Sequence, residues 1–70
     1  MSVTKVIEVI GSSPTSSDDA VREAVAAAAK SIRGISNVDV MSVTCDVEQG
    51  VITRWNALVK ISFPVEPRSS

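Results

Sequence analysis

Apolar and polar residues alternate over the last long run of the chain, residues 51–65. Odd-numbered positions carry apolar residues or Thr, and most even-numbered positions are polar, with Ile52 and Leu58 as apolar exceptions. A period of two is typical of a β-strand with one buried face. Fifteen extended residues span roughly 50 Å, whereas a compact monomer of 70 residues has a radius of gyration of about 11 Å. The strand should therefore bend or pack beyond its own chain, which indicates an oligomer.

Residues 3–10 are rich in β-branched side chains and predict the first strand. Apolar side chains fall on both of its faces, so we expect cover on both sides. Gly11 ends this run and begins a connection, residues 11–16, that is rich in hydroxyl side chains. The connection lacks the lysine and the glycines of a phosphate-binding loop, so its hydroxyls are interpreted as turn and capping groups.

The chain's single helix is predicted over residues 16–33. Ser16, with Asp19 three residues later, resembles a capping box, and Gly34 suits the position that follows a helix. The last turn is expected to hold two basic residues, Lys30 and Arg33. The stripe expected to face the sheet consists of Val21, Val25, Ala28 and Ile32.

Residues 36–48 predict the second strand, and its alternation changes phase midway. The phase change predicts a β-bulge near Met41 or Ser42. Gln49-Gly50 then predicts a tight hairpin turn into residues 51–65.

The predicted element order is β-α-β-β. The hairpin makes the last two strands antiparallel, and a right-handed crossover leaves strands one and two pointing the same way. The last strand is then central, with sheet order 1-3-2. We expect an α+β fold in which a three-stranded antiparallel sheet partly wraps one helix, and in which partners or ligands cover the other sheet face. One domain is expected over residues 1–70, with a frayed polar tail at 66–70.

The composition limits the ways in which so short a chain can be stabilised. The sequence is 44% hydrophobic but only 3% aromatic, and small domains usually need disulfides, a metal or partner subunits. Cys45 is the only cysteine and there is no His, so self-association is the remaining route. The net charge of −1 argues against a nucleic-acid partner. No apolar run approaches the length of about 18 residues that a membrane span needs, and a cytoplasmic protein is expected.

Catalytic chemistry is poorly supported. Without His, and with no base near Ser12 or Ser13 in the sequence, neither general-base nor nucleophilic catalysis is indicated. We therefore predict that the protein is not an enzyme. Trp55 is in phase with the helix-facing side of its strand, which favours a core position over a ligand-stacking one. The carboxylates of the second strand are weak candidates for a calcium site: Asp39, Asp46 and Glu48.

The β-α-β-β order and several short motifs give a resemblance to the dodecin family over about residues 3–66. The residues that carry it are Lys5, Glu8, the loop Gly11-Ser12-Ser13-Pro14, Ala20-Val21, Ala24-Val25, Ile32-Arg33, the turn Val47-Glu48-Gln49-Gly50, and the ending Val59-Lys60-Ile61-Ser62-Phe63. The resemblance implies a hollow homododecamer that binds flavins (FMN, riboflavin or lumichrome) as stacked pairs and stores them without catalysis.

The family's flavin-binding positions are substituted in this chain. Aligned through the hairpin, the stacking Trp falls on Asn37, an Arg-Gly pair on Thr44-Cys45, and the Gln that holds the edge of the flavin ring on Asn56. Asn37 has no π face to stack, and Thr44 lacks the cation that would meet a phosphate. Asn56 keeps an amide that is one methylene shorter.

Two functions stay open. The first is a ligand-binding or storage shell with flavin as the family ligand. The second is a shell that has lost flavin and binds calcium or another small molecule. It is favoured by the three substitutions and by the likeness of the start of the chain and its Pro14-Thr15-Ser16 loop to calcium-binding dodecins.

Overall fold

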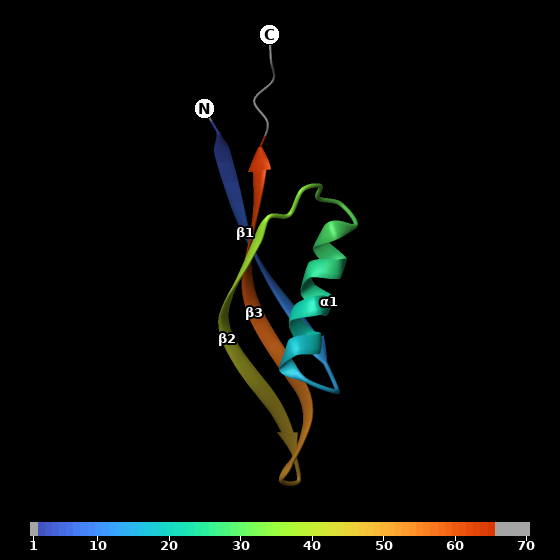
Figure 1. The fold of residues 1–70 in the computed structure, drawn as a ribbon. Helices are drawn as coiled ribbons and strands as arrows, with labels where there is room; N and C mark the ends of the chain where they lie inside the picture. Colours follow the sequence, from blue (N-terminus) through green and yellow to red (C-terminus); the bar gives the residue numbers. More distant parts are fainter. Residues whose placement is uncertain (1, 66–70) are drawn as a thin grey trace.

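The central strand of the sheet is β3, Val51–Val65, in the computed structural model, which describes residues 2–65. It is flanked by β1, Val3–Ser13, and by β2, Asn37–Glu48. Both flanking strands run antiparallel to β3, and the sheet order is β1-β3-β2. The predicted β-α-β-β order and 1-3-2 sheet are confirmed (Figure 1). The tail predicted at residues 66–70 lies outside the described residues.

The hairpin between β2 and β3 also follows its prediction. The β2–β3 register shifts between Val40 and Ser42, which leaves Met41 as the bulged residue. Gln49 and Gly50 make the turn with φ angles of 52° and 77°, the left-handed pair that a two-residue hairpin turn requires. A second irregularity, between Asp46 and Val47, was not predicted.

β1 is longer than the predicted strand of residues 3–10. It pairs with β3 as far as Ser13, opposite Trp55. Although the segment after Ile10 has a turn-like composition, it continues the strand because Gly11, Ser12 and Ser13 pair with β3. The buried Ser13 hydroxyl donates to Asp19 Oδ2 at 2.7 Å, so the end of β1 is tied to the first helical turn.

The helix α1, Ser17–Ala29, begins as predicted and ends earlier. The backbone N–H of Asp19 donates to the side chain of Ser16, the N-cap, at 3.0 Å. The predicted end at Arg33 is wrong: Lys30 is the C-cap, its N–H bonds to the Ala27 carbonyl at 3.3 Å, and the last turn holds no basic residue. The shorter i→i+3 bond tightens the end of the helix, and the chain leaves toward β2.

Of the predicted stripe of Val21, Val25, Ala28 and Ile32, only Ala28 is buried, and the helix packs mainly through alanines. Its buried positions are Ala20, Ala24 and Ala28, while Val21 and Ile32 lie half-buried at the margin of the core. Gly11 explains the shift, because a Cβ built there would clash with the Ala20 carbonyl oxygen and lie 2.8 Å from Ala24 Cβ. The backbone of β1 thus lies directly against α1.

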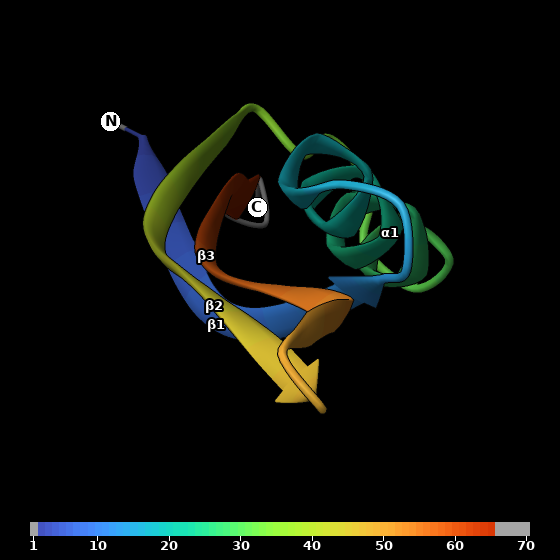
Figure 2. The same cartoon turned by 90° about the horizontal axis from the view of Figure 1, so that it is seen from below.

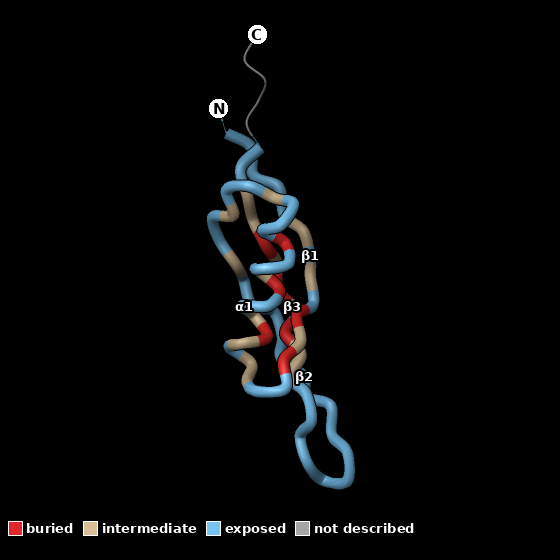
Figure 3. Tube along the Cα trace, turned by 90° about the vertical axis from the view of Figure 1, so that its right-hand side faces the viewer, coloured by how far each residue is buried: buried red, intermediate tan, exposed pale blue. Residues whose placement is uncertain are grey.

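The resulting core is thin. The three helical alanines cover the three fully buried residues of β3, which are Ala57, Val59 and Ile61. The sheet curves so that α1 lies on its concave side (Figure 2). Residues 41–54 of the hairpin are exposed throughout, and we call this segment the hairpin arm (Figure 3).

The molecule is elongated, with extents of 59 × 19 × 12 Å and a radius of gyration of 14.8 Å, against about 11 Å for a compact chain of this length. In the part of the chain that the structure describes, ten large hydrophobic residues are exposed: Val3, Val6, Ile10, Val40, Met41, Val43, Val47, Val51, Ile52 and Val65. Within residues 2–65, no helix has the length and apolarity needed to span a membrane.

The contact at Gly11 leads to the first prediction. Gly11→Ala places a methyl group against the Ala20 carbonyl and Ala24, and should lower the free energy of unfolding by about 3 kcal/mol, the upper end of the usual range for overpacking. Urea unfolding at fixed protein concentration measures the change. Ala27→Ser adds one atom on the exposed side of α1 and should cost about 0.5 kcal/mol or less. Equal stability of the two variants would contradict close packing at Gly11.

Candidate functional site

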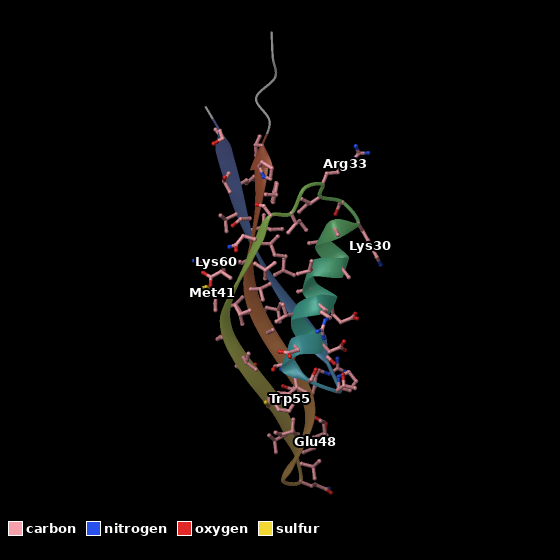
Figure 4. All side chains as sticks on the ribbon, viewed as in Figure 1. Lys30, Arg33, Met41, Glu48, Trp55 and Lys60 are labelled. Carbon is pink, nitrogen blue, oxygen red and sulfur yellow. The ribbon has the colours of Figure 1, made fainter. Side chains whose placement is uncertain are left out.

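The side of the sheet opposite α1 holds the polar side chains of β3. Because Ala57, Val59 and Ile61 are buried under the helix, strand alternation turns Asn56, Leu58 and Lys60 to the other side. We call this side the outer face. Figure 4 shows Lys60 on the side of the sheet away from α1. No helix covers the outer face, so a ligand or a partner can reach it.

A row of polar residues crosses the outer face at the level of Asn56. The strand register places Ser12 of β1 and Thr44 of β2 opposite Asn56 on either side. Ser12 Oγ donates to Asn56 Oδ1 at 2.8 Å, and Asn56 Nδ2 donates to Asp46 Oδ1 at 3.1 Å. A chain of side-chain hydrogen bonds therefore joins all three strands.

Charged residues lie on both sides of this row. Lys60 of β3 lies between Glu8 and Asp39 in the strand register, and Arg54 lies opposite Asp46. The next row consists of Ile10, Leu58 and Ser42; its two apolar residues, Ile10 and Leu58, separate Asn56 from the level of Lys60. The outer face thus offers apolar contact area next to fixed hydrogen-bonding groups, as small-ligand sites do.

The structure brings only two of the four predicted flavin positions together. Thr44 and Asn56 are opposite each other. Asn37 pairs with Ser62, six residues along β3 from Asn56, or about 20 Å at the rise of a strand. Cys45 is exposed, belongs to the helix side of the sheet and lies opposite Trp55. The described residues enclose no pocket, so one chain does not complete a flavin site with these positions.

The candidate calcium ligands are likewise spread along β2. Asp39 lies opposite Lys60, Asp46 opposite Arg54, and Glu48 beside the turn, opposite Val51. Among residues 2–65, no three acidic, His or Cys side chains are grouped in a metal-binding arrangement. A calcium site that used these residues would need ligands from another chain.

The structure tests the sequence interpretation of two further residues, Trp55 and Ser12. Trp55 is half-buried and packs against the margin of the core, as its phase predicted. Ser12 was interpreted as a loop hydroxyl, yet it is a strand residue that bonds Asn56. Continuing the alternation of residues 3–10 beyond Gly11 would have placed Ser12 on the same face as Glu8 and Ile10.

Comparison with known proteins decides the family. A family model described as Dodecin matches residues 3–66. The chain belongs to the dodecin family. The sequence resemblance is thereby confirmed over nearly the whole chain, and the β-α-β-β architecture above is that of a dodecin protomer.

Solved dodecin structures superpose closely on this one. The dodecin from Streptomyces coelicolor is 33% identical, with a TM-score of 0.91 and 96% of each chain covered. A calcium dodecin from Mycobacterium tuberculosis, described as a calcium-chelating immunodominant antigen with a novel calcium-binding site, is 35% identical, with a TM-score of 0.80 and 97% of each chain covered. A Thermus thermophilus protein shares the fold at 20% identity and a TM-score of 0.92, with 97% of this chain and 100% of that chain covered. A search of curated proteins gives no match.

Proposed function

We propose that this dodecin is a non-enzymatic homododecamer that binds and stores a small ligand, with flavin (FMN or riboflavin) as the family ligand. The observation that carries the proposal is the large uncovered sheet of a chain that belongs to the dodecin family. Among residues 2–65, only six hydrophobic residues are buried, three of them alanines of α1, while ten large hydrophobic residues are exposed. Copies of the same chain would cover that apolar surface and supply the core that a single chain lacks.

Assembly would also complete the ligand site. Asn37 and Asn56 are about 20 Å apart along the sheet, so a single ligand would contact both positions only where outer faces of different copies meet. The apolar row of Ile10 and Leu58 offers contact area for a flat ring, and the Asn56 amide offers hydrogen bonds. Binding and storage need no catalytic base, which agrees with a sequence that has no His.

The flavin assignment is tested by restoring the two lost groups. We expect Asn37→Trp with Thr44→Arg to bind FMN at least about tenfold more tightly than the unaltered protein. Aromatic stacking is worth about 0.5–1.5 kcal/mol, a hydrogen bond to a charged group about 1.5–3 kcal/mol, and tenfold corresponds to about 1.4 kcal/mol. Quenching of flavin fluorescence during titration gives the affinities.

Arg22→Trp, on the exposed side of α1, is the matched control and should leave FMN affinity unchanged. If neither the unaltered protein nor the double variant quenches flavin at high micromolar concentration, flavin is removed from the account and the assembled shell remains.

The alternative function is a dodecin shell that binds calcium in place of flavin. It is favoured by the 35% identity to a calcium dodecin over 97% of both chains, and by the loss of the stacking Trp at Asn37. Asp39, Asp46 and Glu48 are the proposed ligands, and oxygen donors of this kind suit calcium.

Calorimetry and thermal unfolding test this alternative. Calcium at about 100 times its dissociation constant should add about 2.7 kcal/mol of stability, and a chelator should remove it. The gain should fall in Asp39→Asn and persist in Glu23→Gln, a carboxylate variant on the exposed side of α1. Identical melting with calcium and with chelator would count against a metal site.

A further inference from the structure

Three side chains on the outer face form one continuous hydrogen-bond chain across the sheet. Ser12 of β1 donates to Asn56 Oδ1 at 2.8 Å, and Asn56 Nδ2 donates to Asp46 Oδ1 of β2 at 3.1 Å. Ser12 and Asn56 are half-buried, and Asp46 is exposed. The amide of Asn56 is therefore held from both sides, with its oxygen toward β1 and its nitrogen toward β2.

Asp46 is the member of this chain that determines the direction of the amide. An ionised carboxylate only accepts hydrogen bonds, so it must face the N–H₂ end of Asn56. A serine hydroxyl both donates and accepts, and Ser12 can therefore serve either orientation of the amide. Arg54, the cation opposite Asp46, has donors only and leaves the acceptor role of the carboxylate unchanged.

The fixed amide leaves a defined pair of groups for a ligand. Asn56 Oδ1 keeps one free lone pair on the β1 side, and Nδ2 keeps one N–H on the β2 side. A ring bound over Asn56 must then turn a donor toward β1 and an acceptor toward β2. With the opposite amide orientation, the donor of the ring would face the Asn56 N–H and its acceptor would face Asn56 Oδ1, and neither hydrogen bond could form.

We propose that Asp46 is a specificity-determining residue, which positions the Asn56 amide so that the site selects a planar ring with adjacent N–H and C=O groups in one orientation. This role rests on the proposed function, because it concerns the same ligand site. Asp46 acts through Asn56 and is a positioning residue.

Riboflavin titration of Asp46→Asn tests the role, because riboflavin is uncharged and does not respond to the lost carboxylate charge. The new amide can donate as well as accept, so Asn56 adopts both orientations. We expect riboflavin binding to weaken about fivefold, the equivalent of one neutral hydrogen bond. Asp46→Glu keeps an acceptor-only group and should recover most of the affinity.

Glu8→Gln is the matched control. Glu8 is a carboxylate on the same face, opposite Lys60 and outside the hydrogen-bond chain, and its removal should change riboflavin affinity by less than about twofold. Native mass and circular dichroism of every variant establish that it is folded and assembled. Equal affinity in Asp46→Asn and in the unaltered protein would overturn the proposal.

A second readout does not depend on ligand. In side-chain ¹⁵N spectra of the ligand-free protein, one Asn56 amide proton should be shifted downfield and exchange slowly, because it bonds a carboxylate. The downfield shift and the slow exchange should both be lost in Asp46→Asn and kept in Glu8→Gln. If the unaltered protein binds no riboflavin, the flavin function fails, and the spectra still decide the role of Asp46: an Asn56 signal that is unchanged by Asp46→Asn overturns it.

Discussion

The close approach of α1 to the backbone of β1 at Gly11 is the contact on which the rest of the protomer depends. Only a residue without a Cβ leaves room there, since the Ala20 carbonyl occupies the space that a side chain would need. The alanines of α1 extend the contact along the helix, and the curved sheet closes over a narrow core of Ala57, Val59 and Ile61. A slim helix on a long sheet leaves the hairpin arm and the outer face uncovered.

The sheet surface that α1 leaves uncovered connects the fold with the proposed function. A three-stranded sheet with an elongated shape of 59 × 19 × 12 Å has two free edges and exposed valines on the hairpin arm, which in an isolated chain would favour aggregation. The proposed closed assembly of identical copies would remove both hazards. In the proposed assembly, the outer faces of different copies would meet, and the row of Ser12, Asn56 and Thr44 would form the polar part of a shared site.

Much of the fold could be predicted from the sequence because period-two alternation determined β3, and the phase change in β2 located the bulge at Met41. The end of β1 could not, because it depends on pairing with β3. The packed face of α1 could not either, because it depends on the contact at Gly11. For the site, the sequence singled out Asn56 and Asp46 separately. Their hydrogen bond, and the part played by Ser12, follow from the strand register, which no single segment of the sequence contains.

The native mass of the purified protein tests the central claim most directly, because the proposed assembly accounts for both the uncovered sheet and the thin core and would complete the proposed ligand site. Native mass spectrometry at low micromolar concentration should give one species with a mass about twelve times the 7.4 kDa of the chain. A stable, folded monomer or dimer under these conditions would contradict the account.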